Sequence, residues 1–205
     1  MPGNDAIALA FTGASGAQYG LRLLELLIKA DRRVYLMLSK PAQLVIGMET
    51  DVKLPSRAAD AEEFLAQRFA ARPGQLRVFS PEQWTAPVAS GSAPIAAMVI
   101  CPCSMATLSA VASGASRSLI ERGADVAIKE QRKLIIVPRE TPFSAIHLEN
   151  MLKLARLGVV VLPANPGFYH RPTQLEEVVD FVVARVLDHL GIAHDLVAAW
   201  GEQGE

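Results

Sequence analysis

Thr12-Gly13-Ala14-Ser15-Gly16 is the stretch that decides the fold, because it lies between an apolar strand and a helix. The strand is predicted over residues 7–11 and the helix over about residues 17–30. Small residues at such a turn leave backbone N–H groups free at the positive end of the helix, where phosphate and other anions bind. We expect Ser15 to cap the helix and the two glycines to let a ligand approach the backbone. The alternative is an ordinary helix cap without a ligand.

The turn does not match the best-known glycine-rich motifs. Ser15 stands where a dinucleotide fingerprint has its second glycine. No lysine follows, as a P-loop requires, and Ala17 replaces the last glycine of a hydrolase elbow. The turn therefore indicates a phosphate, but not a dinucleotide, a nucleoside triphosphate or an acyl group.

Length and composition indicate one globular domain over residues 1–205, since no linker, repeat or low-complexity stretch divides the chain. The formal net charge of -1 gives no electrostatic reason to expect nucleic acid or an anionic membrane as a partner. No apolar run could span a bilayer and no secretory signal is recognisable, so we expect a cytoplasmic protein. The cysteines and histidines show no metal-ligand spacing, so we expect no metal.

Apolar strands are predicted to alternate with helices along the chain. The strands cover residues 7–11, 33–38, 76–79, 96–101, 133–137 and 159–162. This alternation is typical of an α/β fold with three layers, in which helices cover both faces of a mainly parallel sheet. Ligands bind such sheets beyond the carboxyl ends of the strands, where the strand order reverses.

Polar turns follow these strands and should gather at one edge of the sheet. The turns at Ser15 and Ser104 share one layout, so a flat ligand with a phosphate would fit between them; two unrelated helix caps are the alternative. Arg139 offers a planar fork for phosphate, and Glu140 could transfer a proton, although an adjacent Arg-Glu pair is more often a surface ion pair.

Other candidate residues are scattered along the chain. Trp84 and Trp200 offer aromatic faces to a developing cation, although core or interface positions are commoner for tryptophan. Four further donors suit a phosphate, but their spacing does not bring them together: Arg122, Lys129, Tyr169 and Arg185.

Seven short motifs resemble those of the UbiX-type flavin prenyltransferases, formerly described as phenylacrylic acid or polyprenyl-hydroxybenzoate decarboxylases. They are TGASG at residues 12–16, CPCS at 101–104, TLS at 107–109, DVAIKE at 125–130, VPRE at 137–140, HLENM at 147–151 and PGFY at 166–169. The motifs run in family order over nearly the whole chain, and together they are specific. The resemblance implies a Rossmann-like or flavodoxin-like sheet that holds FMN, in a homo-oligomer, expected to be a dodecamer, with sites at subunit interfaces.

The resemblance also implies a role for each matching position. FMN would be held by Gly13, Ala14, Ser15, Ser39, Ser104, Met105, Ala106, Thr107 and Arg139. Dimethylallyl phosphate would be held by Tyr169 and Arg185, joined by Lys129 and Arg122. Glu49 and Glu140 would be the acid–base residues, Ser15 would also orient the flavin, and Trp84 and Trp200 would face the allyl cation.

The implied reaction needs no metal and uses dimethylallyl phosphate as the donor. The dimethylallyl group is attached to N5 of reduced FMN, and a ring then closes at C6. Phosphate leaves the allylic carbon, which explains a cationic pocket. The product, prenylated FMN, would serve a separate UbiD-type decarboxylase in ubiquinone biosynthesis or aromatic acid decarboxylation.

Three departures from the family pattern concern packing rather than chemistry: Met105-Ala106, Ser116-Arg117-Ser118 and Gly123. Two other functions stay open as alternatives. One is an FMN-dependent cysteine-type decarboxylase, although residues 163–172 lack that group's paired methionine and asparagine. The other is a non-catalytic flavin-binding regulator, against which the retained acidic and cationic residues argue.

Overall fold

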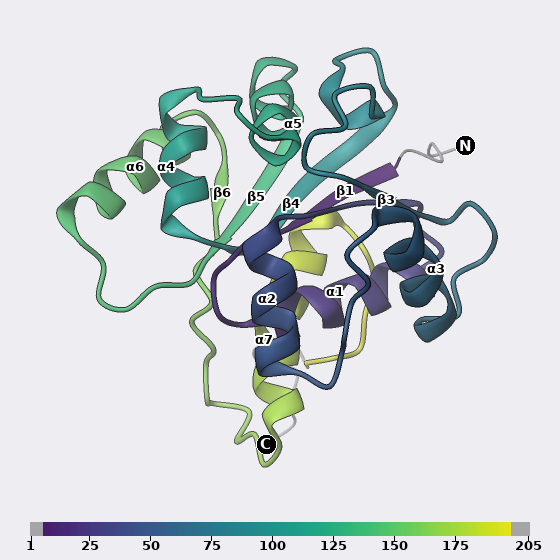
Figure 1. Cartoon of the computed structure of the whole chain (residues 1–205). Helices are drawn as coiled ribbons and strands as arrows, with labels where there is room; N and C mark the ends of the chain where they lie inside the picture. Colours follow the sequence, from purple (N-terminus) through teal and green to yellow (C-terminus); the bar gives the residue numbers. More distant parts are fainter. Residues whose placement is uncertain (1–5, 198–205) are drawn as a thin grey trace.

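Six parallel strands form one sheet in the order β3-β2-β1-β4-β5-β6, and helices cover both of its faces (Figure 1). The computed structural model describes residues 6–197. Its elements are β1 (Ala6–Phe11), α1 (Ala17–Lys29), β2 (Val34–Leu38), α2 (Lys40–Glu49), α3 (Ala58–Arg68), β3 (Leu76–Phe79), η1 (Pro87–Ala89), β4 (Ile95–Cys103), α4 (Met105–Ser113), α5 (Leu119–Lys129), β5 (Lys133–Pro138), α6 (Ala145–Arg156), β6 (Val160–Val161) and α7 (Leu175–Leu190). The predicted three-layer α/β fold with a parallel sheet is confirmed.

The strand order reverses once, between β1 and β4. From β1 the chain steps outward through β2 to β3, then returns so that β4 pairs with the other side of β1. β5 and β6 continue outward on that side. Open parallel sheets bind ligands at such a reversal, so the turns after β1 and β4 lie where a ligand site is expected.

β1 shows how one strand serves two cores. Ile7, Leu9 and Phe11 pack in the core that includes residues of α1 and α7. Ala8 and Ala10 pack in the other core, with residues of α4 and α5. Successive side chains of a strand point to opposite faces, so an all-apolar strand is buried on both. Figure 1 shows the two helix layers on either side of the sheet.

Arg22 of α1 and Asp180 of α7 join the two helices on one face of the sheet. The Nε and NH2 groups of Arg22 donate to the two carboxylate oxygens of Asp180, at 2.7 and 3.0 Å. The hydrogen bonds that Arg22 donates to Asp180 raise the pKa of Arg22 above its ordinary value. A two-bond contact of this kind fixes orientation as well as distance, so α7 is held in place along α1.

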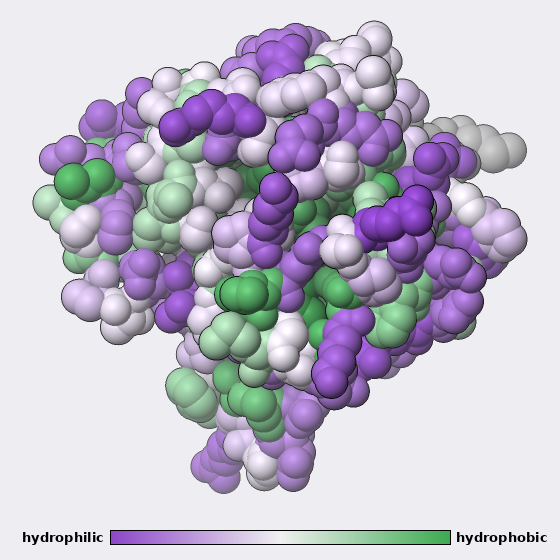
Figure 2. Space-filling model, in the orientation of Figure 1, coloured by the Kyte–Doolittle hydropathy of each residue, from purple (hydrophilic) through white to green (hydrophobic). Residues whose placement is uncertain are grey.

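Two helices expose large apolar side chains. Figure 2 shows hydrophobic surface over α2 and at α6. The exposed residues are Leu44 and Met48 of α2, and Ile146, Leu148 and Leu152 of α6. Groups of large exposed apolar side chains commonly mark contacts with other protein surfaces. Within residues 6–197, no helix combines the length and the apolarity needed to cross a membrane.

The bounds of β4 and β6 differ most from the prediction. β4 runs to Cys103 instead of ending at Cys101, because the carbonyl of Pro102 accepts hydrogen bonds from Thr12 and the segment stays beside β1. Its pairing with β5 changes register between Ile100 and Cys103. β6 covers only residues 160–161 instead of 159–162.

Candidate active site at the strand reversal

Thr12 connects the turns that follow β1 and β4. Its hydroxyl donates to the Pro102 carbonyl at 2.8 Å and accepts the Ser104 N–H at 2.7 Å. Its own N–H also donates to Pro102, at 3.3 Å. The side chain is buried, so this hydroxyl sets the separation of the two turns. Sequence reasoning missed this role; the only signal was a hydroxyl residue directly before the glycine turn.

The two turns leave backbone donors without partners. Among the described residues, nothing accepts the N–H groups of Gly13, Ala14 and Ser15 in the first turn. The same holds for Met105 and Ala106, the first two residues of α4. Polar backbone groups of this kind are normally satisfied by a ligand or by water. Five donors on adjacent turns fit a ligand with a phosphate and a carbonyl-rich ring, as FMN has.

Ser104 caps α4, which follows β4, and Ser39 caps α2, which follows β2. Ser104 accepts the Thr107 N–H at 3.3 Å, which confirms the predicted cap of α4. Ser39 accepts the Ala42 N–H at 3.1 Å at the start of α2. The turn at Gly13 abuts this helix, because a Cβ at Gly13 would lie 2.5 Å from the Cβ of Pro41. Glycine is therefore required where the two turns meet.

Glu49 occupies the amino end of α1. Its Oε2 accepts the N–H groups of Gly16 at 2.8 Å and Ala17 at 3.0 Å. The capping residue is Gly16, with φ of 102°, so the prediction that Ser15 caps this helix is wrong. The Ser15 side chain instead hydrogen-bonds Glu49. Partial burial opposes ionisation of Glu49, but the bonds from Ser15, Ala17 and Gly16 and the charge of Arg139 together lower its pKa.

Arg139 reaches from the end of β5 to the first turn. Its Nε donates to the Ser15 carbonyl at 3.2 Å, and its backbone N–H donates to Cys103. Tyr19 lies beside the same turn, since a Cβ at Gly16 would meet its ring at 2.8 Å. Burial and the neighbouring Cys101 raise the pKa of Tyr19, while Arg139 lowers it. The sequence analysis missed Tyr19; its signal is an aromatic residue one turn after the glycine that begins α1.

Some predicted residues lie near the reversal and others do not. Glu140 follows Arg139 at the same edge, where its carboxylate accepts the Thr141 N–H of its own loop at 3.1 Å. Tyr169 lies in the loop between β6 and α7, where its ring contacts Phe181 of α7. Arg185 is one helical turn further along α7 and pairs with Asp188 at 2.6 Å.

Lys129 and Arg122 lie on α5, and Lys129 is at the edge of the sheet opposite to the turns after β1 and β4. Lys129 pairs with Glu130 beside Gly91, just ahead of β4. Arg122 pairs with Asp125 at 2.7 Å and donates to the Ala89 carbonyl at 3.2 Å. A six-residue strand such as β5 separates the two edges by about 20 Å. A single chain therefore does not bring Lys129 to the turn at Gly13.

Comparison with known proteins identifies the family. The family model described as Flavoprotein matches residues 1–187. The flavin prenyltransferase UbiX of Pseudomonas aeruginosa is 60% identical over 203 residues, which cover 99% of this chain and 97% of that protein. The chain belongs to the UbiX family of flavin prenyltransferases.

Two solved UbiX structures share this fold. AnUbiX in complex with FMN and dimethylallyl pyrophosphate is 36% identical with a TM-score of 0.86, covering 98% of this chain and 99% of its own. A dodecameric FMN-dependent UbiX-like decarboxylase from Escherichia coli is 38% identical with a TM-score of 0.82, covering 92% of this chain and 96% of its own. The predicted resemblance to the UbiX family is thus confirmed.

The remaining candidates of this UbiX chain are peripheral or outside the described residues. Trp84 is exposed in a turn after β3, where its N–H donates to the Glu82 carbonyl. Trp200 lies outside residues 6–197. Over that range, no group of three or more His, Cys, Asp or Glu side chains could hold a metal ion.

Cys101 and Cys103 are fully buried, and burial raises the pKa of Cys101 to about 12.

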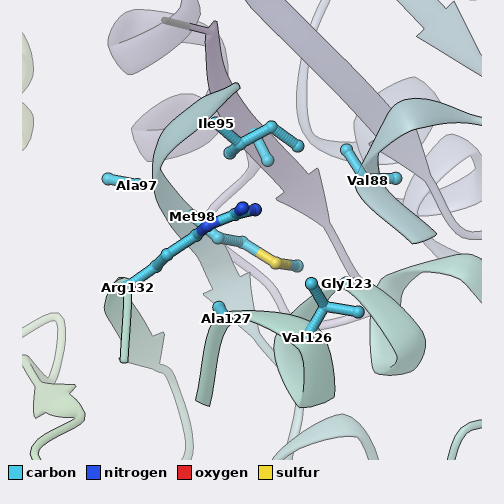
Figure 3. Close-up of a pocket in the computed structure, with 9 residues that line it drawn as sticks. Val88, Ile95, Ala97, Met98, Gly123, Val126, Ala127 and Arg132 are labelled. Atoms are coloured by element: carbon cyan, nitrogen blue, oxygen red, sulfur yellow. The ribbon is translucent and has the colours of Figure 1, made fainter. Parts of the chain in front are cut away.

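A small apolar cavity between η1, β4 and α5 is not part of the site. Figure 3 shows Val88, Met98 and Val126 around it and the Arg132 side chain extending across it. Its volume of about 10 Å³ is at the lower limit for a single water molecule. FMN cannot enter a space of that size.

Proposed function

We propose that this protein transfers the dimethylallyl group of dimethylallyl phosphate to N5 and C6 of reduced FMN and so makes prenylated FMN. The observation that carries the proposal is the set of five unbonded N–H donors on two adjacent turns, next to Arg139 and the Glu49 carboxylate. The name flavin prenyltransferase, borne by the relative from Pseudomonas aeruginosa, and the FMN and dimethylallyl pyrophosphate bound by AnUbiX support both substrates.

The residues at the reversal hold the flavin. The FMN set is Gly13, Ala14, Ser15, Ser39, Ser104, Met105, Ala106, Thr107 and Arg139. The free N–H groups bind phosphate and ring carbonyl oxygens, while the Arg139 guanidinium adds a positive charge whose direction is fixed by the Ser15 carbonyl. Binding reduced FMN and the allylic phosphate side by side replaces a collision between them by a fixed geometry.

Glu49 is the proposed base of the first step. As N5 forms its bond to the allylic carbon, the C–O bond breaks and phosphate leaves with the bonding electrons. The N5 proton must then go to an acceptor, and the lowered pKa of Glu49 keeps its carboxylate ionised at neutral pH. Ser15 links Glu49 to the flavin turn, and Glu140 is the second acid–base residue of the pocket.

The donors for dimethylallyl phosphate come from more than one copy of the chain. Lys129 and the flavin turns lie at opposite edges of the sheet, so a lysine that contacts the substrate phosphate belongs to another subunit. Arg122, Tyr169 and Arg185 complete this phosphate site, and Trp84 and Trp200 face the allyl group. The exposed apolar faces of α2 and α6 support a homo-oligomer, and the dodecamer of the Escherichia coli relative supports twelve copies.

Mixed oligomers test the shared site. Glu49→Gln and Lys129→Ala chains with different tags are each assayed alone, then unfolded together, reassembled and purified through both tags. If the site is shared, neither variant alone makes product, and the mixture regains activity because some sites combine an intact Glu49 with an intact Lys129. Reassembled single variants are the control. A mixture as inactive as its parents contradicts the shared site.

The reaction itself is tested by anaerobic incubation with reduced FMN and dimethylallyl phosphate, followed by mass spectrometry of the released flavin. The expected flavin is heavier by one C5 prenyl unit. Unmodified FMN released from folded, flavin-loaded protein would contradict the proposal. The product is then added to a flavin-free UbiD-type decarboxylase, the proposed user of prenylated FMN in the cytoplasm, and recovery of decarboxylation is measured.

A further inference from the structure

Three aromatic rings and a glycine meet where the loop after β6 contacts α7. The rings of His170 and Phe181 are stacked, with centroids 5.5 Å apart and planes 8° apart. The Tyr169 ring stands nearly perpendicular to both, 5.8 Å from His170 at 79° and 5.7 Å from Phe181 at 76°. These are favourable geometries for aromatic pairs. We call Gly167, Tyr169, His170 and Phe181 the aromatic clamp.

His170 contributes a flat surface to the aromatic clamp rather than polar contacts. Both ring nitrogens are buried and have no hydrogen-bond partner among the described residues. Buried polar atoms are normally paired, so an imidazole in this position is not held by its nitrogens. What holds it is the stacking on Phe181. A phenyl ring could make the same contact.

Gly167 brings the loop backbone onto the edge of the Phe181 ring. A Cβ at Gly167 would lie 2.9 Å from Cζ of Phe181 and 3.1 Å from Cε1 of Tyr169. A methyl group at residue 167 would therefore displace one of the two rings. The Phe181 ring is therefore covered by loop backbone at its edge and by His170 on one face.

Phe181 is itself fixed relative to the flavin turns. Its neighbour Asp180 accepts both hydrogen bonds from Arg22 of α1. The amino end of α1 carries the Glu49 carboxylate and adjoins the unbonded N–H groups. A continuous set of contacts thus runs from the flavin turn along α1 to α7 and on to Tyr169.

We propose that His170 and Phe181 are positioning residues for Tyr169. They hold its ring and hydroxyl where the substrate phosphate binds, through aromatic packing, with no proton transfer or hydrogen bond from the imidazole. The inference rests on the proposed function, in which Tyr169 binds dimethylallyl phosphate. It adds two residues and a glycine whose effect on that substrate passes through Tyr169.

The test compares four variants of the full oligomer with two matched controls. His170→Phe keeps a flat ring and removes both nitrogens, whereas His170→Ala removes the ring. Phe181→Leu keeps apolar volume without a flat face, and Gly167→Ala places a methyl group against both rings. His189→Ala, elsewhere on α7, and Phe64→Leu, on α3 against the same core, are the controls. Measured quantities are KM and kcat for dimethylallyl phosphate, its equilibrium binding by calorimetry, and the Kd for FMN.

We expect His170→Ala, Phe181→Leu and Gly167→Ala to raise KM and the dissociation constant of dimethylallyl phosphate about tenfold, the effect of losing one aromatic pair. The kcat and the Kd for FMN should stay within about twofold of wild type, a split that general destabilisation would not produce. His170→Phe and both controls should match wild type in every quantity and in pH profile.

Three results would overturn the inference. His170→Phe as impaired as His170→Ala would show that a ring nitrogen acts. A wild-type KM in His170→Ala would show that stacking is unimportant. This variant decides the question even if Phe181→Leu does not fold. Equal losses in FMN and dimethylallyl phosphate binding would indicate a structural role only. If wild type makes prenylated FMN, these results leave the proposed function standing; if wild type binds no dimethylallyl phosphate, both fail.

Discussion

Glu49 and Gly16 are joined by a 2.8 Å hydrogen bond from the Gly16 N–H to the Glu49 carboxylate. The carboxylate comes from the last residue of α2 and sits at the amino end of α1. Helix dipole and free N–H groups favour an anion at that place, and here the chain supplies its own. The donors that stay open for the flavin are therefore those of residues 13–15, one step before the helix.

Glu49→Gln should lower the free energy of unfolding of the flavin-free protein by about 1 kcal/mol at neutral pH, the usual value of such a cap. The folded pKa of Glu49 lies below the ordinary 4.5. Its charge therefore stabilises the fold above that pH, and this contribution is lost as the pH falls through the folded pKa. Urea unfolding at a series of pH values should show the difference from wild type shrinking in acid. Glu82→Gln, at an exposed position, is the control, and a pH-independent difference would contradict the cap.

Arg139→Ala should weaken FMN binding about 10- to 100-fold, because hydrogen bonds to a charged group contribute about 1.5–3 kcal/mol each. Arg139→Lys should be intermediate, since an ammonium keeps the charge without the planar fork. Quenching of FMN fluorescence on titration measures the Kd. Arg117→Ala is the matched control, because only the backbone N–H of Arg117 makes a hydrogen bond in the described structure. A Kd for Arg139→Ala within twofold of wild type would remove Arg139 from the flavin site.

Gly123→Ala should stabilise the protein and leave activity unchanged. Alanine is favoured over glycine inside a helix by about 0.5–1 kcal/mol. Its methyl group would enter the cavity of Figure 3, 3.2 Å from the sulfur of Met98, a flexible side chain that can move by a few tenths of an ångström. Gly47→Ala in α2 isolates the helix effect, because nothing lies within 4 Å of the added methyl group. Calorimetry that shows a lower Tm for Gly123→Ala and a higher one for Gly47→Ala would mean that Met98 cannot move.

Cys101 and Cys103 should not react with a thiol reagent in the folded protein. Both are fully buried, and burial raises the pKa of each thiol, that of Cys101 to about 12. The reactive thiolate is therefore absent at neutral pH, and the reagent has no access. Colorimetric titration should detect neither thiol until denaturant is added, and then both. Fast labelling of the native protein would contradict this burial.

The sheet and its polar edge could be predicted because their signals are local. Apolar runs mark the strands, and hydroxyl residues such as Ser104 mark the helix starts, where the structure confirms a cap. The contact of the Glu49 carboxylate with the amino end of α1 could not be predicted. Glu49 lies 33 positions from Gly16, and only the tertiary fold brings them together. Lys129 illustrates a further limit, because the fold of one chain leaves it at the opposite edge from the flavin turns.

The Thr12 hydroxyl gives the flavin site an assembly requirement. Its two hydrogen bonds reach across 90 and 92 positions of the sequence, to Pro102 and Ser104. Neither the first half of the chain nor the second carries both sets of flavin donors, and the Thr12 side chain joins the two sets where β1 and β4 end. Flavin capture therefore reports that the two halves have docked.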